Sequence, residues 1–226
     1  MKHVLDRPVW SALGTRHASL AEGDMLARRY PTSIAPFVAT DNESSESLQA
    51  LAKLASTGEN VLLLMADPIV APLDFAIVTA APAVQMVAAE RLEQVWDDRI
   101  VQLSQADAAE MLDLATLTKP GPFSLRALSL GDFWGIRIGG RLVAMAGERM
   151  KQSGYTELSG VCTHPDFRRK GLGRLLSLYV ADKIFARGDQ PYLHAYATNK
   201  SAIALYESIG FKLRSAMNVA VIRGPI

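Results

Sequence analysis

The segment from Val161 to Arg174 constrains the fold of this 226-residue chain more than any other. A β-like run ends near Thr163, a short connection contains Pro165, and the glycines Gly171 and Gly173 open a helical pattern. Glycine lets the backbone approach a ligand closely because it has no Cβ. The first amides of a helix lack internal partners and lie at the positive end of the helix dipole. The segment therefore predicts a strand-to-helix junction that binds an anion such as a pyrophosphate.

Basic side chains surround these glycines: Arg168, Arg169, Lys170 and Arg174, with only Asp166 opposing them. Such side chains strengthen an anion site through charge-assisted hydrogen bonds. The spacing matches neither a Walker loop nor the GxGxxG dinucleotide fingerprint. Taken alone, two glycines and some arginines fit a solvated surface turn as well as an anion site. The sequence around this segment is needed to choose between the two.

The second half of the chain predicts alternating strands and helices. A Gly139-Gly140 pair between two β-like runs is the clearest hairpin signal. The expected strands are 100–103, 133–138, 141–148, 155–163, 192–197 and 217–222, and the expected helices are 104–117, 171–187 and 199–209.

The first half also mixes helix and strand, without a motif that carries recognisable chemistry. Helices are expected over 10–27 and 44–55, and strands over 34–39, 61–65 and 83–90. Pro68, Pro72 and Pro82 argue against one continuous element between the last two strands. We expect an N-terminal α/β domain over residues 1–93 and a second domain over 94–226.

Two motifs together resemble the GNAT superfamily of N-acyltransferases. Arg168, Gly171 and Gly173 match its Arg/Gln-x-x-Gly-x-Gly/Ala signature at a strand-to-helix junction. Downstream, the run from Asn199 to Phe211 matches a second hallmark, an asparagine followed by Leu-Tyr-Glu and Gly-Phe. The resemblance covers about residues 100–226. It implies an α/β (α+β) fold with a mixed, mostly antiparallel central sheet flanked by helices.

The resemblance further implies an N-acetyltransferase that moves an acetyl group from acetyl-CoA to a primary amine of a small molecule or peptide. The implied cofactor-binding residues are Val161, Cys162, Thr163, Arg168, Arg169, Lys170, Gly171, Leu172, Gly173, Arg174, Asn199 and Tyr206. Asn199 and Tyr206 are seven positions apart, hence on one helix face. Tyr206 is the expected general acid for the departing thiolate, and an ordinary core tyrosine is the alternative.

Glu157 is the first candidate for the catalytic base, because some members of the superfamily carry a glutamate at the corresponding place. A carboxylate with a raised pKa in a partly desolvated cleft could accept the proton of an ammonium substrate. A solvent-facing strand glutamate is an equally good reading, and Glu148 is the second candidate. His164 more plausibly shapes its loop. Cys162 could suggest a covalent acyl-cysteine, but no histidine lies near it in the sequence, so direct transfer in a ternary complex is favoured.

Composition excludes several classes of function. The formal net charge is +1, which argues against nucleic acid and anionic membranes as partners. The balanced total charge also argues against reading the basic run from Arg168 to Lys170 as a nucleic-acid-binding patch. One cysteine excludes an internal disulfide and a cysteine-built metal site, and no metal is expected. No signal peptide or membrane span is recognised, so a cytoplasmic protein is expected.

The layout is similar to the FR47-like and glycine N-acyltransferase-like branch, in which a divergent first half precedes an intact GNAT half. The first half would then be a degenerate GNAT-like unit; an unrelated cap or dimerisation domain is the alternative, and a homodimer is possible. The acceptor pocket is expected near 119–130, with Phe123 and Trp134 as lining or core residues. The rival function is a module that senses coenzyme A without turnover.

Overall fold

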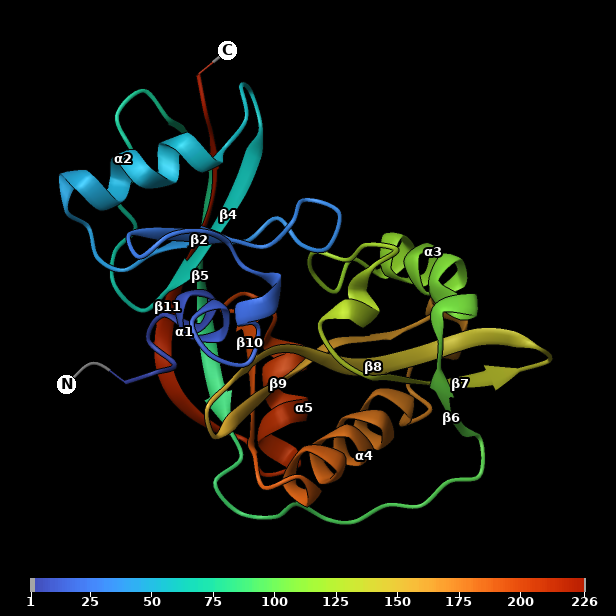
Figure 1. Cartoon of the computed structure of the whole chain (residues 1–226). Helices are drawn as coiled ribbons and strands as arrows, with labels where there is room; N and C mark the ends of the chain where they lie inside the picture. Colours follow the sequence, from blue (N-terminus) through green and yellow to red (C-terminus); the bar gives the residue numbers. More distant parts are fainter. Residues whose placement is uncertain (1–2, 226) are drawn as a thin grey trace.

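A computed structural model describes residues 3–225 and is built on an eight-stranded sheet (Figure 1). The order of its strands is β4-β11-β5-β10-β9-β8-β7-β6. Their bounds are β4 Asn60–Met65, β5 Ala76–Val87, β6 Ile100–Leu103, β7 Phe133–Ile138, β8 Arg141–Gln152, β9 Tyr155–Thr163, β10 Gln190–Tyr196 and β11 Lys212–Arg223. Only β9 and β10 pair in parallel; the other neighbours are antiparallel.

Residues 3–225 also contain a second, three-stranded sheet, five α-helices and four short 3-10 helices. The small sheet consists of β1 Glu22–Gly23, β2 Ala27–Arg29 and β3 Val38–Thr40. The helices are α1 Pro8–Leu13, α2 Ser45–Leu54, α3 Ala108–Thr118, α4 Leu172–Ala186 and α5 Lys200–Ser208. The mixed, mostly antiparallel sheet with flanking helices is therefore confirmed.

Helices α3 and α4 cover opposite faces of the large sheet (Figure 1). Alternation along β7 explains this arrangement, because successive side chains of a strand point to opposite faces. Phe133 packs in the cluster of α3, whereas Trp134 and Ile136 pack in the cluster of α4. The face under α4 also receives Tyr206 of α5.

The second half follows the sequence closely. The hairpin at Gly139 and Gly140 has positive φ at both glycines, as a tight turn with this twist requires. Strand β9 has the predicted bounds. In the first half, α2 begins after Ser44, whose side chain accepts a hydrogen bond from the Ser47 amide.

The helix predicted over 10–27 is wrong. Helix α1 ends before Gly14, and the chain then turns into β1 and β2. Gly23 has φ +111°, and a Cβ there would lie 2.2 Å from the carbonyl oxygen of Ala27, so only glycine fits this turn. Pairing of β2 with β3 decides the local structure. Only residues 38 and 39 of the expected strand 34–39 lie in β3, and the expected strand 83–90 is replaced by the longer β5, which begins earlier and ends at Val87.

The large sheet crosses the division expected after residue 93. Strands β4 and β5 come from the first half, yet β11 lies between them and β5 lies between β10 and β11. The division into two domains and the reading of the first half as a degenerate GNAT-like unit remain predictions. The observed arrangement puts the first half against the open end of β9 and β10, where the candidate site lies.

Residue His17 makes the stability of this fold sensitive to acid. Burial, followed by the charge of Lys151, lowers the pKa of His17 to about 4, and its Nδ1 lies 2.8 Å from the hydroxyl of Tyr30. Between the pKa of about 4 in the folded chain and the ordinary histidine pKa of about 6.5, the unfolded chain carries a proton on His17 that the folded chain lacks. We expect this residue to remove about 3 kcal/mol of unfolding free energy as the pH falls from about 6.5 to about 4.

Denaturant unfolding at several pH values measures this effect. The variant His17→Gln should lose most of the pH dependence above pH ~5, where few carboxylates titrate. The control His3→Gln alters an exposed histidine and should keep the wild-type slope. An unchanged slope in His17→Gln would contradict the assignment.

Candidate functional site

Strands β9 and β10 pair only at their beginnings and then separate. The paired residues are Tyr155 to Glu157 on β9 and Gln190 to Tyr192 on β10. From Leu158 onward, β9 has no partner on the β10 side among residues 3–225. The backbone groups of β9 on that side are therefore available to an elongated ligand; cofactor binding by Val161, Cys162 and Thr163 stays a prediction.

A bulge in β9 marks the point of separation. The register with β8 shifts between the pairs Gly147–Ser159 and Met145–Cys162. Gly160 lies inside this shift with φ +63°, and a Cβ there would come within 2.7 Å of the ring of Phe133. Bulges bend a strand and re-aim its backbone groups, often beside active sites.

The predicted anion site contains a run of free backbone amides. Among residues 3–225, no hydrogen-bond acceptor is found for the six amides from Arg169 to Arg174; the first amide that donates is that of Leu175, to the carbonyl of Gly171. Arg169 and Gly171 both have positive φ, at 61° and 75°. A loop of this kind at a helix start is suited to an anion.

The basic side chains of this junction lie at the surface. Arg168, Arg169, Lys170 and Arg174 are all exposed, and Arg174 pairs with exposed Glu93 at 2.7 Å. Leu172 is buried in the cluster under α4, which anchors the first turn of the helix. A Cβ added to Gly173 would be 3.7 Å from Thr163 Oγ1, so the helix starts close to the end of β9.

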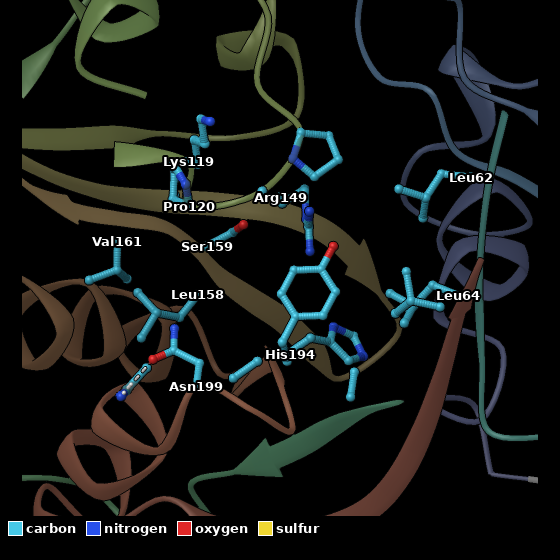
Figure 2. Close-up of a pocket in the computed structure, with 18 of the residues that line it drawn as sticks. Leu62, Leu64, Lys119, Pro120, Arg149, Leu158, Ser159, Val161, His194 and Asn199 are labelled. Atoms are coloured by element: carbon cyan, nitrogen blue, oxygen red, sulfur yellow. Dashed lines mark hydrogen bonds between the residues drawn. The ribbon is translucent and has the colours of Figure 1, made fainter. Parts of the chain in front are cut away.

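A pocket of about 870 Å³, counting the part open to solvent, occupies the mouth between β9 and β10 (Figure 2). Its lining residues are Phe37, Leu62, Leu64, Ala83, Lys119, Pro120, Gly121, Pro122, Arg149, Leu158, Ser159, Gly160, Val161, His194, Ala195, Tyr196, Asn199, Ala202, Tyr206 and Val219. Figure 2 shows Ser159 and Arg149 across the pocket from Leu62 and Leu64, with His194 and Asn199 nearby.

Tyr206 and Asn199 line this pocket together. Asn199 caps α5, since its side chain accepts a hydrogen bond from the Ala202 amide at 3.2 Å. Tyr206 is 8 % exposed, and its hydroxyl makes no hydrogen bond to another described residue. Burial raises the pKa of Tyr206 to about 12, so its hydroxyl stays protonated at neutral pH.

Glu157 lies behind the pocket wall, completely buried in a network of hydrogen bonds. Its carboxylate accepts from Arg149 Nε and Nη2 at 2.8 and 2.7 Å, and His194 Nδ1 lies 2.7 Å from it. Burial alone would raise the pKa of Glu157, but the charge and hydrogen bonds of Arg149, aided by His194, hold it well below its usual range. The raised pKa expected for a base is therefore contradicted.

His194 does not offer a free nitrogen in its place. Its Nδ1 is occupied by Glu157, and its Nε2 lies 2.8 Å from Gln85 Nε2. Gln85 is itself buried and also donates to the carbonyl of Leu5. The ring of His194 is thus held from both sides and forms part of the pocket wall.

The other residues considered for catalysis, Glu148, His164 and Cys162, do not line the pocket. Glu148 is buried in ion pairs with Lys151, at 2.7 Å, and Arg187. His164 begins the short helical turn after β9 and accepts a hydrogen bond from the Asp166 amide, as a loop-shaping residue would. Burial raises the pKa of the Cys162 thiol to about 11, so it is a protonated, weak nucleophile.

The expected acceptor region is only partly at the pocket. Lys119 to Pro122 line it. Trp134 packs in the core with its ring 6.0 Å from that of Tyr179, and Phe123 packs on Phe133 at 5.5 Å. Sequence reasoning missed Arg149 and His194, whose roles depend on contacts across strands, and Phe37, Leu62 and Leu64, which come from the first half.

Residues 3–225 contain no group of three or more His, Cys, Asp or Glu side chains that could hold a metal ion. No helix in this part of the chain has the length and apolarity needed to cross a membrane.

Comparison with known proteins places residues 133–220 in the family model described as FR47-like protein. Among solved structures, a protein from Novosphingobium aromaticivorans DSM 12444 that is assigned to the GNAT family is 39 % identical to this chain. The match covers 100 % of both chains with a TM-score of 0.93. A GCN5-related N-acetyltransferase from Kribbella flavida covers 100 % of this chain and 97 % of its own at 15 % identity and a TM-score of 0.68, which concerns the fold alone.

Curated relatives match shorter segments. The ribosomal protein bS18-alanine N-acetyltransferase of Salmonella typhimurium is 46 % identical over 55 residues, which are 24 % of this chain and 37 % of that protein. The N-alpha-acetyltransferase RimI of Mycobacterium tuberculosis is 37 % identical over 83 residues, or 34 % of this chain and 50 % of that protein. The chain thus spans only about a third to a half of these relatives.

Proposed function

Because the chain belongs to the GNAT family of acetyltransferases, we propose that it transfers an acetyl group from acetyl-CoA to a primary amine of a small molecule or peptide. The observation that carries the proposal is one continuous path. The free amides before Leu175 lie beside the end of β9, where an added Cβ of Gly173 would be 3.7 Å from Thr163 Oγ1, and the open side of β9 lines one pocket with Tyr206. The fit to a pyrophosphate followed by a pantetheine arm supports acetyl-CoA.

The proposed division of labour follows from these residues. The amides from Arg169 to Arg174 bind the pyrophosphate, with Arg168 and Lys170 available to further phosphate oxygens. The backbone of β9 from Val161 to Thr163 holds the pantetheine arm. Asn199 fixes the start of α5, and thereby the position of Tyr206. When bound, acetyl-CoA supplies a thioester carbonyl carbon that an amine can attack.

The acetyl group is transferred directly from acetyl-CoA to the amine in a ternary complex. The amine nitrogen forms a bond to the acetyl carbon, the carbon–sulfur bond breaks, and the amine loses its proton to water in the pocket. The departing sulfur receives the proton of Tyr206 Oη, which solvent then replaces. Cys162 takes no part, because a thiol with a pKa of about 11 is protonated. Proximity accounts for much of the acceleration.

We propose Glu157 as a positioning residue rather than as the base. Its ionised carboxylate fixes Arg149 and His194 in the pocket wall. Between about pH 5 and pH 10, neither Glu157 nor Tyr206 changes its charge. We therefore expect kcat/KM to rise with pH along the deprotonation of the acceptor itself, and this rise should move when an acceptor with another amine pKa is used.

The variant Glu157→Gln separates the two roles. As a positioning residue, it should lower kcat/KM at every pH and leave the pH of half-maximal activity unchanged for a given acceptor. If Glu157 were the base, the substitution should abolish the rise of kcat/KM with pH or move it to another pH. A rise fixed at one pH for acceptors of different amine pKa would also contradict the proposal, because it would report a group of the protein.

The test of the function itself is thiol release from acetyl-CoA in the presence of a panel of amines, with the acetylated product identified by mass. We expect release that depends on the amine and equals the product formed. Binding of acetyl-CoA without amine-dependent release by any panel member would instead favour the coenzyme A-sensing module.

A further inference from the structure

The two walls of the pocket differ in chemistry. Leu62 and Leu64 of β4 and the paired Val219 of β11 form an apolar wall, and Phe37, bridged to Leu62, extends it toward Arg149. The opposite wall carries Arg149 and Ser159, and Figure 2 shows both across from Leu62 and Leu64. An occupant that fits both walls has an apolar body and a polar or charged group on one side.

The charge of the lining is positive. Arg149 and Lys119 belong to it, and the twenty described lining residues include no aspartate or glutamate. Glu157, the carboxylate bound to Arg149 and His194, is completely buried and does not line the pocket. Polyamines, aminoglycosides and lysine side chains would bring further cations into this lining without an anion to receive them.

Arg149 retains hydrogen-bonding capacity toward the pocket. Its Nε and Nη2 are used by Glu157, and its guanidinium carbon lies 4.9 Å from the ring centre of Phe37. Its Nη1 makes no hydrogen bond to another residue among 3–225, and the side chain is 14 % exposed. The contacts with Glu157 and Phe37 hold the guanidinium in place. Nη1 lies 4.0 Å from where a Cβ of Gly121, another lining residue, would be, so it is on the pocket side and can meet a ligand carboxylate.

We infer that the acceptor is a small amine that carries both a carboxylate and an apolar side chain, that is, a hydrophobic α-amino acid or a close analogue. This inference rests on the proposed acetyl transfer. Arg149 Nη1 binds the carboxylate, and Leu62 and Leu64 receive the side chain. Arg149 is then a specificity-determining residue. A protein N-terminus has a peptide carbonyl where the carboxylate would be, so it lacks the charge that Arg149 recognises.

The experiment compares matched acceptors with the full chain at saturating acetyl-CoA. Phenylalanine is paired with phenylalaninamide, which lacks the carboxylate charge, and leucine is paired with glycine, which lacks the apolar side chain. Values of kcat/KM are compared per neutral amine, since the amine pKa differs within each pair. We expect at least a 10-fold preference for phenylalanine over its amide and for leucine over glycine. Spermidine should be the poorest acceptor.

Two variants attribute these preferences to residues. Arg149→Lys keeps a cation beside Glu157 but removes Nη1, and should lower the phenylalanine-to-amide ratio at least 5-fold. Leu64→Ala widens the apolar wall and should lower the leucine-to-glycine ratio while leaving the acid-to-amide ratio near the wild-type value. A melting curve of each variant checks the fold.

The wild-type ratios decide the inference even where a variant fails to fold. Amides, glycine or spermidine used as well as the hydrophobic acids would overturn it. Where no amine releases thiol although acetyl-CoA binds, the proposed function fails separately. Calorimetric titration of the acetyl-CoA-loaded chain with phenylalanine and with its amide then tests the carboxylate site by itself: tighter binding of the acid supports the role of Arg149, and equal or absent binding overturns it.

Discussion

The variant Gly171→Asp is expected to bind acetyl-CoA at least about 100-fold more weakly than the wild type, a loss of about 2.7 kcal/mol. Gly171 has φ +75°, and a Cβ there would meet no atom within 4 Å, so the new carboxylate would project into the open space beside the free amides. There it would occupy the anion site and repel a pyrophosphate. Ligand-induced thermal stabilisation measures the effect.

At a ligand concentration 100 times the wild-type dissociation constant, binding adds about 2.7 kcal/mol to the stability of the folded chain. For a chain of this size we expect the melting temperature to rise by about 5 to 10 °C in the wild type and by about 1 °C in the variant. Gly188→Asp is the matched control, because Gly188 has φ +84° and no atom within 4 Å of an added Cβ. Equal loss in both variants would show backbone strain, not an anion site.

The variant Tyr206→Phe is expected to lower kcat/KM about 100-fold while changing the affinity for acetyl-CoA less than about 3-fold. The substitution removes the hydroxyl and keeps the ring, which packs 6.0 Å from that of Phe211. General acid catalysis typically contributes about 10²- to 10⁴-fold. We expect an effect at the low end of this range, because a pKa of about 12 makes the Tyr206 hydroxyl a weak proton donor. Steady-state kinetics with one fixed acceptor provides the measurement.

Tyr179→Phe is the control for this prediction. Tyr179 lies on α4, packs against Trp134 and does not line the pocket, so its loss of a hydroxyl should leave kcat/KM within about 2-fold. Normal turnover by Tyr206→Phe would remove Tyr206 from the role of general acid and leave it as a core tyrosine.

The second half of the fold could be predicted because its signals are local. Gly139 and Gly140 define the β7–β8 hairpin, and the glycines of the anion loop mark the start of α4. The first half was harder to predict, because long-range pairing decides its structure. Residues 22, 23 and 27, which the helix expected over 10–27 includes, instead belong to strands β1 and β2 of the small sheet. Nothing near β5 in the sequence indicates that it lies between β10 and β11.

The candidate site likewise contains residues that local motifs predict and residues that depend on contacts between distant segments. The anion loop, Asn199 and Tyr206 follow from motifs, and the structure brings the last two to one pocket. Arg149 and the apolar wall could not be predicted, because they meet only when strands from both halves are assembled. The lowered pKa of Glu157 has the same origin, since Arg149 and His194 reach it from the two neighbouring strands.

Calorimetric titration of the wild-type chain with acetyl-CoA measures whether the anion loop and β9 bind this ligand. We expect one site per chain with a micromolar dissociation constant, and competition by free coenzyme A. If neither acetyl-CoA nor coenzyme A binds at millimolar concentration, the free amides from Arg169 to Arg174 and the open side of β9 have no such ligand and the proposed acetyl transfer is wrong.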